Sequence, residues 1–173
     1  FRAWHDPSYD LPFAEACERN REPILAALLP RMPGRGIVLE IGSGTGQHVV
    51  FFAPRFPAVS FQPSDRLEHL PGVNARIRAE GGPNILPAIE LNVRGVWPDR
   101  KFAAVYSANT AHIMSMAQVE RMFAGWRAMY PKDSDLTVDL EPEPAAGHAG
   151  YLYSLAGLVR LQRRFRAEDL RYR

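Results

Sequence analysis

The glycine-rich stretch E-I-G-S-G-T-G-Q-H, residues 40–48, has the residue types and the spacing of a ligand-binding turn. It directly follows an apolar run at 37–41 that predicts a buried strand. Glycines there permit a tight turn and let a ligand lie against bare backbone beside the start of the next helix. A dinucleotide fingerprint starting at Gly42 needs a third glycine at position 47, where this sequence has Gln47, which together with His48 is expected to cap the turn. A nicotinamide-dependent oxidoreductase is therefore the less favoured alternative.

Asp65 is expected to lie beside this turn. It follows a strand-like segment at 58–61, nineteen residues after Gly46, and parallel strands bring their carboxyl ends to one edge of a sheet. A carboxylate only accepts hydrogen bonds, which suits a bidentate contact with the two hydroxyls of a ribose. The alternative is a helix N-cap ahead of Arg66, because aspartate is favoured at that position.

The periodicity of the sequence predicts alternating helices and strands around these residues. Helices are expected at 14–29, 48–56, 66–80 and 116–129, and strands at 37–41, 58–61, 85–91 and 102–108. This alternation implies an α/β, Rossmann-like fold with a mostly parallel sheet and helices on both faces. After Pro131 we expect a strand at 136–140, then a loop, and a last helix at 151–165.

The composition limits the possible functions. No run of about eighteen apolar residues is present and the N-terminus has no apolar signal-peptide core, so neither a membrane protein nor secretion is expected. The first residue is Phe1 rather than Met, which indicates that the true start of the chain is missing. Cys17 is the single cysteine, which excludes an internal disulfide and a cysteine metal cluster and fits a cytoplasmic location. No H-x-x-H, C-x-x-C or paired-carboxylate pattern predicts a metal site.

The charge balance gives only weak support to a nucleic-acid partner. The formal net charge is +2, and arginines gather near the C-terminus. We interpret this cluster as a solvated helix face or tail, with a polyanion-binding patch as the alternative. Its members are Arg160, Arg163, Arg164, Arg166, Arg171 and Arg173.

The pattern E-x-G-x-G-x-G at 40–46 resembles the first motif of the class I methyltransferases that use S-adenosylmethionine. Four stretches carry a more specific resemblance: A-C-E-R-N-R-E-P-I-L (16–25), V-L-E-I-G-S-G-T-G-Q-H (38–48), F-Q-P-S-D (61–65) and S-A-N-T-A-H-I (107–113). Over about residues 14–130, the chain is similar to the methyltransferase-like protein 26 family, formerly a domain of unknown function. The resemblance implies the class I methyltransferase fold, S-adenosylmethionine as cofactor and an unknown methyl acceptor, for which we expect a small molecule.

Two departures from this family favour a second hypothesis, a binding module for S-adenosylmethionine that keeps the fold without catalysis. Ala103 stands where similar proteins carry Asp, and K-D-S-D-L-T-V-D-L stands where they have a Gly-Gly turn and an apolar strand. We therefore expect one methyltransferase-like domain over 1–173 whose C-terminal strands are truncated or divergent. Its parts are a helical cap at 1–35, a cofactor-binding core at 36–130 and a divergent part at 131–173.

The expected fold and the chemistry of the side chains predict roles for individual residues. Asn92 stands where similar proteins carry an Asp that accepts a hydrogen bond from the adenine; the alternative is a surface-loop asparagine. Arg19 would bond the methionine carboxylate, or else face solvent. His112 is the candidate base and Asn109 would orient the substrate or the methionine end of the cofactor; a structural hydrogen bond at a helix start is the alternative for His112. The expected cofactor-binding residues are Glu40, Gly42, Ser43, Gly44, Thr45, Gly46, Asp65, Asn92, Arg19, Asn20 and Asn109.

Overall fold

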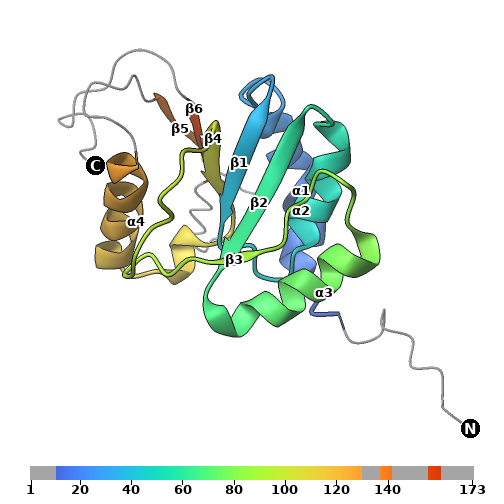
Figure 1. Cartoon of the computed structure of the whole chain (residues 1–173), viewed down its shortest axis with the longest axis horizontal. Helices are drawn as coiled ribbons and strands as arrows, with labels where there is room; N and C mark the ends of the chain where they lie inside the picture. Colours follow the sequence, from blue (N-terminus) through green and yellow to red (C-terminus); the bar gives the residue numbers. More distant parts are fainter. Residues whose placement is uncertain (1–10, 130–136, 142–155, 161–173) are drawn as a thin grey trace, which may run out of the picture.

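The computed structural model describes residues 11–129, 137–141 and 156–160. At residues 112, 137–141 and 156–160 it describes the backbone but not the side chains. Its centre is a sheet in the strand order β3-β2-β1-β4-β6-β5 (Figure 1). The strands β1 to β4 run parallel, whereas β6 is antiparallel to both β4 and β5. The strands are β1 (Gly36–Ile41), β2 (Val59–Asp65), β3 (Ile89–Glu90), β4 (Ala104–Ser107), β5 (Thr137–Glu141) and β6 (Ala156–Arg160).

The four parallel strands bring their carboxyl ends to one edge of the sheet. Ile41 at the end of β1 pairs with Ser64 of β2 and Ser107 of β4, and Asp65 pairs with Glu90 of β3. The turn that follows β1 therefore lies between the ends of β2 and β4. The predicted α/β fold, with a mostly parallel sheet and helices on both faces, is confirmed.

The helices begin where local signals favour them. α4 starts with a capping box, in which the backbone N of Gln118 donates to Ser115 Oγ at 3.3 Å and the backbone N of Ser115 donates to Gln118 Oε1 at 2.9 Å. α2 starts directly after Gly46, whose φ of 75° few other residues adopt. The described helices are α1 (Glu15–Leu28), α2 (Gln47–Phe52), η2 (Ala53–Arg55), η3 (Leu67–His69), α3 (Leu70–Glu80), η4 (Ala111–Ile113) and α4 (Met116–Ala128).

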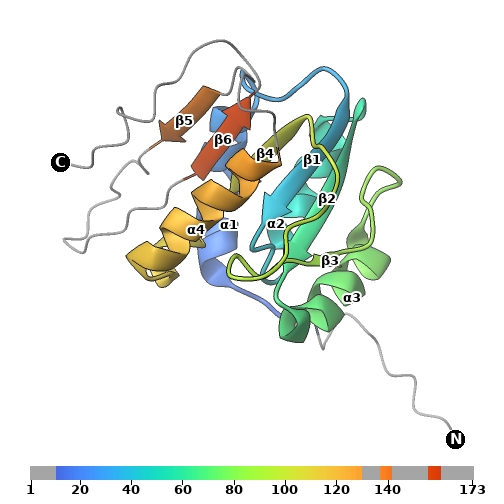
Figure 2. The same cartoon turned by 60° about the vertical axis from the view of Figure 1, so that its left-hand side comes forward.

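The two faces of the sheet have separate apolar cores, because successive strand side chains point to opposite faces. In Figure 2, α4 lies on one side of the sheet and α1 and α2 lie on the other. Val38, Phe61 and Tyr106 pack toward α1 and α2. Leu39 and Val105, their neighbours along the strands, pack toward α4. Both helical layers thus hold the carboxyl edge of β1 and β4 in place.

Two strands differ from the prediction. β2 continues past the expected end at Phe61 through the Q-P-S-D segment, which pairs with β1 as far as Ser64 and with β3 at Asp65. β3 contains only two residues rather than the whole of 85–91. Ile85 makes an isolated bridge to Phe61, and Pro87 then interrupts the ladder because it has no N–H to donate.

The prediction of a helix over 151–165 is wrong at 156–160, which form the strand β6; its other residues lie outside the described residues. β6 lies between β4 and β5 and pairs with both. A short apolar run such as A-G-L-V fits a strand as well as a helix, so the pairing partners decide its conformation. The strand expected at 136–140 is present as β5.

Candidate functional site

The three glycines of the turn have different surroundings. Gly42, Gly44 and Gly46 all have positive φ, of 76°, 56° and 75°. A Cβ at Gly42 would overlap the side chain of Thr110, so this glycine permits close packing between the turn and the segment after β4. A Cβ at Gly44 would have no atom within 4 Å. The turn therefore has a packed side at Gly42 and an open side at Gly44.

Asp65 lies at the end of β2 and bonds the open side of the turn. Its Oδ2 accepts a hydrogen bond of 2.7 Å from the backbone N of Gly44. Its Oδ1 accepts from the backbone N of Arg66 at 2.7 Å and from His69 Nδ1 at 2.9 Å. The N-cap of η3 is Arg66 and that of α3 is His69, so Asp65 caps neither helix. The carboxylate is held against the turn instead.

Glu40 and Ser43 support the turn from inside the protein. Glu40 is 2% exposed, and its Oε2 accepts a hydrogen bond of 2.6 Å from Ser43 Oγ. Burial raises the pKa of the Glu40 carboxyl from 4.5 to about 7, although the Ser43 hydrogen bond acts against this shift. Tyr106 pairs with Glu40 across β1 and β4, and burial and this carboxylate raise the pKa of its phenol. The Tyr106 hydroxyl has no hydrogen-bond partner among the described residues.

Gln47 connects the turn to the N-terminal helix. Its Oε1 accepts hydrogen bonds from the backbone N of Ala14 at 2.7 Å and from Thr45 Oγ1 at 2.8 Å. Its Nε2 donates to Glu18 Oε1 at 2.7 Å. These hydrogen bonds hold α1 against the first turn of α2. Gln47, the residue that departs from the dinucleotide fingerprint, therefore positions α1 relative to the glycine turn.

A second connection runs from α2 through α1 to the segment after β4. His48 Nε2 lies 3.0 Å from Asn20 Oδ1, and Asn20 Nδ2 donates to Asn109 Oδ1 at 2.7 Å. Burial lowers the pKa of His48 from 6.5 to about 4. Asn109 has a φ of 56°, and its buried Nδ2 has no hydrogen-bond partner among the described residues. This chain of side chains brings two predicted cofactor residues, Asn20 and Asn109, together.

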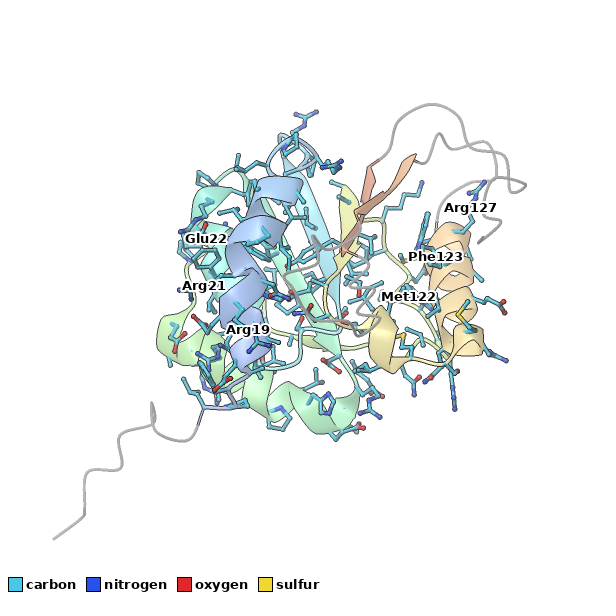
Figure 3. All side chains as sticks on the ribbon, turned by 180° about the vertical axis from the view of Figure 1, so that it is seen from behind. Arg19, Arg21, Glu22, Met122, Phe123 and Arg127 are labelled. Carbon is cyan, nitrogen blue, oxygen red and sulfur yellow. The ribbon has the colours of Figure 1, made fainter. Side chains whose placement is uncertain are left out.

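Arg19 and Asn92 lie apart from this network, and of His112 only the backbone is described. Arg19 projects from α1 (Figure 3); its side chain is 71% exposed and pairs with Glu15 at 3.5 Å. Asn92 is exposed after β3, and its Oδ1 accepts a hydrogen bond of 3.0 Å from the backbone N of Arg94. The backbone of His112 lies in η4, close in sequence to Asn109, and its side chain lies outside the described residues. The proposed roles of these residues stay predictions.

The sequence analysis missed two residues that contact this region. Cys17 lies near Thr45 and Asn109; burial raises the pKa of its thiol, and hydrogen bonding with Thr45 acts against that shift. It lies three positions before Asn20 on α1, a spacing that places both on one helix face and could have indicated this. Arg76 of α3 is 6% exposed, and its Nε donates to the carbonyl of Thr45 at 2.9 Å. Nothing local in the sequence indicates the Arg76 contact.

The described part of the chain has neither a metal-ligand cluster nor a membrane-spanning helix. It contains no group of three or more His, Cys, Asp and Glu side chains that could hold a metal ion. None of its helices is both long and apolar enough to cross a membrane.

A mostly parallel sheet with a glycine turn after β1 and an acidic residue at the end of β2 is a Rossmann-like fold, and it is similar to the fold of solved methyltransferases. The chain belongs to the family described as Protein of unknown function (DUF938), whose model matches residues 11–139. This membership confirms the resemblance to the methyltransferase-like protein 26 family.

Solved methyltransferases share the fold. CalO1, a methyltransferase in calicheamicin biosynthesis solved in the SAH-bound form, is 17% identical with a TM-score of 0.56, and the match covers 78% of this chain and 40% of CalO1. The glycopeptide N-methyltransferase MtfA, complexed with S-adenosyl-L-homocysteine, is 15% identical with a TM-score of 0.55, over 72% of this chain and 54% of MtfA. An O-methyltransferase family 2 protein from Planctomyces limnophilus DSM 3776, in complex with apigenin, is 18% identical with a TM-score of 0.53, over 75% of this chain and 42% of that protein. The chain thus spans about half the length of these proteins or less, and the likeness shows the fold alone.

Proposed function

We propose that this protein binds S-adenosylmethionine at the 42–46 turn and transfers its methyl group to a small-molecule acceptor at the carboxyl edge of the sheet. CalO1 and MtfA, which share the fold, were both solved with S-adenosylhomocysteine, the product that remains after methyl transfer. Ligands of open α/β sheets bind outside the carboxyl ends of the strands, and the turn lies at that edge.

The observation that carries this proposal is the open space at Gly44. A left-handed φ of 56° together with no atom within 4 Å of a Cβ means that packing within the protein does not require glycine here, although the backbone conformation favours it. Gly42 is different, because Thr110 fills the corresponding space. Open backbone at a single position of the turn is what a ligand lying flat against it needs.

Asp65 fits the ribose of such a ligand. A carboxylate has about four acceptor positions, and donors of the protein use three of them at Asp65. One position remains for a ribose hydroxyl. The His69 side chain is 42% exposed, so its bond is the one that a second hydroxyl would most easily replace. This role gives Asp65 two tasks, holding the turn through Gly44 and holding the ribose.

The cofactor supplies an activated methyl group on a sulfonium sulfur, so the protein mainly has to bring a nucleophile in line with it. Holding two reactants in the right geometry is worth roughly 7–11 kcal/mol. The acceptor forms a bond to the methyl carbon as the carbon–sulfur bond breaks. Its proton, where it has one, would go to His112 or to solvent. We propose His112 as the base because its backbone follows β4 at the same edge.

Cofactor binding is tested with Gly44→Ala and with the matched control Gly34→Ala. A Cβ at Gly34 also meets nothing within 4 Å, but Gly34 precedes β1 at the opposite edge of the sheet. We expect Gly44→Ala to weaken binding of S-adenosylhomocysteine at least about tenfold in calorimetry, because the methyl group occupies the contact surface. Gly34→Ala should bind like the wild type.

Gly44→Asn provides a second variant. Asparagine adopts positive φ more readily than alanine, so this variant strains the backbone of the turn less. Wild-type affinity in both Gly44 variants would contradict the proposed binding surface.

Catalysis is tested separately from binding. The protein is incubated with S-adenosylmethionine and a panel of small molecules, and S-adenosylhomocysteine is measured by mass spectrometry. Binding by the wild type without turnover would favour the binding module over the methyltransferase. Where turnover is found, His112→Ala should slow transfer far more than it weakens cofactor binding. Equal turnover in that variant would remove His112 from the mechanism.

A further inference from the structure

The side chains of His48, Asn20 and Asn109 form a directed chain of hydrogen bonds. With its proton on Nε2, His48 donates to Asn20 Oδ1 at 3.0 Å. The amide N of Asn20 then donates to Asn109 Oδ1 at 2.7 Å, across 89 positions of the sequence. Because each group accepts at one end and donates at the other, the chain ends in a donor, Asn109 Nδ2.

This donor has no partner within the described part of the protein. The Nδ2 atom of Asn109 is buried and makes no hydrogen bond there. The Cys17 thiol lies near the Asn109 side chain, but no bond of good geometry joins them. A buried donor without a partner costs about 1–3 kcal/mol, so a native structure rarely keeps one without use.

The position of this donor is next to the glycine turn. Asn109 follows β4 at the carboxyl edge, and the next residue, Thr110, packs into the space beside Gly42. Thr110 Oγ1 also lies 3.3 Å from the carbonyl O of Gly42. Asn109 itself has a left-handed φ of 56°, a conformation that asparagine tolerates.

We propose that Asn109 Nδ2 binds the α-carboxylate of the cofactor, and that Asn20 and His48 are positioning residues that hold the Asn109 carboxamide in this orientation. The inference rests on the proposed function, in which S-adenosylmethionine occupies the turn. An N–H donor selects the carboxylate over the neighbouring ammonium group, because an ammonium group needs an acceptor. This assigns to Asn109 the contact that sequence alone attributed to Arg19, whose exposed side chain pairs with Glu15.

His48 is fixed at the start of this chain by burial and by stacking. The side chain is 5% exposed and stacks on Phe52 with ring centroids 5.3 Å apart. Its lowered pKa of about 4 keeps the imidazole neutral at physiological pH, so one ring nitrogen carries a proton. Two contacts with α1 act against this shift of the His48 pKa: a hydrogen bond with the backbone of Cys17 and the charge of Glu18.

The test replaces the donor by an acceptor in Asn109→Asp. This change keeps the shape of the side chain, its tolerance of positive φ and the bond from Asn20. Affinity is measured by calorimetry for S-adenosylhomocysteine, which carries the α-carboxylate, and for methylthioadenosine, which lacks the amino-acid group. We expect the variant to bind S-adenosylhomocysteine about 10–100-fold more weakly and methylthioadenosine within about twofold of the wild type.

Asn20→Asp tests the positioning residue without touching Asn109. Its carboxylate can only accept, so the Asn109 carboxamide is expected to turn its Nδ2 toward residue 20 and its Oδ1 toward the ligand. The affinity for S-adenosylhomocysteine should fall relative to that for methylthioadenosine, whereas a merely structural loss would lower both equally. Glu22→Ala, an exposed change two positions further along α1 (Figure 3), is the matched control and should change neither affinity.

The outcomes separate this inference from the proposed function. If the wild type binds neither nucleoside, the proposed function fails and this inference fails with it. If the wild type binds both and Asn109→Asp leaves their affinity ratio unchanged, only the inference is overturned. Tighter binding of S-adenosylhomocysteine by Asn109→Asp would also overturn it, because it would mean that Asn109 presents its oxygen to the ammonium group.

Discussion

The face of the sheet covered by α1 and α2 buries ionisable groups within its apolar core, whereas the face covered by α4 buries only apolar and uncharged polar side chains among the described residues. Glu40, His48 and Tyr106 are all 5% exposed or less on the first side. On the second side, apolar residues such as Leu39 and Met122 form the core, and the buried polar residues Gln62 and Ser107 carry no charge. The same sheet therefore supports two kinds of packing.

The difference follows from what each face holds. Burying an ionisable group is unfavourable unless hydrogen bonds replace water, and here those hydrogen bonds hold the turn and the N-terminal helix. The buried polar groups on the face under α4 are neutral: Ser107 Oγ, for example, donates to the carbonyl O of Ile41 at 2.9 Å. We therefore expect pH to act on stability through the first face, and substitutions on the second face to leave ligand binding unchanged.

The largest expected effect is the loss of stability on acidification through His48. Its pKa is about 4 in the folded protein and 6.5 as an ordinary histidine, so the unfolded chain binds a proton first as the pH falls. The contribution of His48 is complete above pH 6.5 and is lost between about pH 6.5 and pH 4, by roughly 3 kcal/mol. Urea unfolding of the wild type and His48→Gln over this range measures it. Parallel curves for the two proteins would show that His48 is not held neutral by burial.

Glu40 is expected to act in the opposite direction. Its folded pKa of about 7 lies above 4.5, so its contribution to stability is complete below pH 4.5 and is lost as the pH rises to about 7. Glu40→Gln keeps an acceptor for Ser43 and removes the charge. At pH 8 the variant should be more stable than the wild type by up to roughly 3 kcal/mol, and at pH 4.5 the two should be nearly equal. A variant that is less stable at pH 8 would mean that the charged carboxylate is well solvated.

Gly125 on α4 gives the matching experiment for the other face. A Cβ at this position would overlap the indole ring of Trp97, which packs directly on the helix. Gly→Ala in an exposed helix stabilises by about 1 kcal/mol, but overpacking costs about 1–3 kcal/mol and should prevail here. We expect Gly125→Ala to lower the free energy of unfolding with no change in S-adenosylhomocysteine affinity.

The double variant with Trp97→Ala serves as the control for Gly125→Ala. In that background the added methyl group has space and should no longer destabilise. Altered affinity in the folded single variant would contradict the separation of the two faces.

The elements around the turn could be predicted because their signals are local. An apolar run, spaced glycines and an acidic residue at the end of the next strand are all visible in the sequence, and β1, α2 and the position of Asp65 follow from them. β6 could not be predicted in the same way, because its strand conformation depends on pairing with β4 and β5. Pro87 was visible, yet only the pairing with β2 shows that it shortens β3.

The hydrogen bonds that join His48, Asn20 and Asn109 could not be predicted from the sequence for a similar reason. Asn20 and Asn109 were each candidates, but their bond joins positions 89 residues apart, and no local pattern encodes it. The same holds for Arg76, which reaches the carbonyl of Thr45 from α3. Sequence patterns located the residues near the turn, and the packing of α1 across it determined which of them meet.

The smallest expected effect comes from the start of α4. Within the face covered by α4, this helix start is close in sequence to the site residue Asn109. Ser115 and Gln118 form a reciprocal capping box, which satisfies two backbone N–H groups at an exposed helix end. Ser115→Ala should destabilise the protein by about 1 kcal/mol, and Ser115→Thr, which keeps the cap, by less. Thermal unfolding measures both. Because η4 lies between Ser115 and Asn109, a loss of S-adenosylhomocysteine affinity in Ser115→Ala that Ser115→Thr does not show would mean that the cap also positions the segment after β4. The start of α4 would then contribute to ligand binding. Unchanged affinity would show that the residues from Ser115 onward affect only stability.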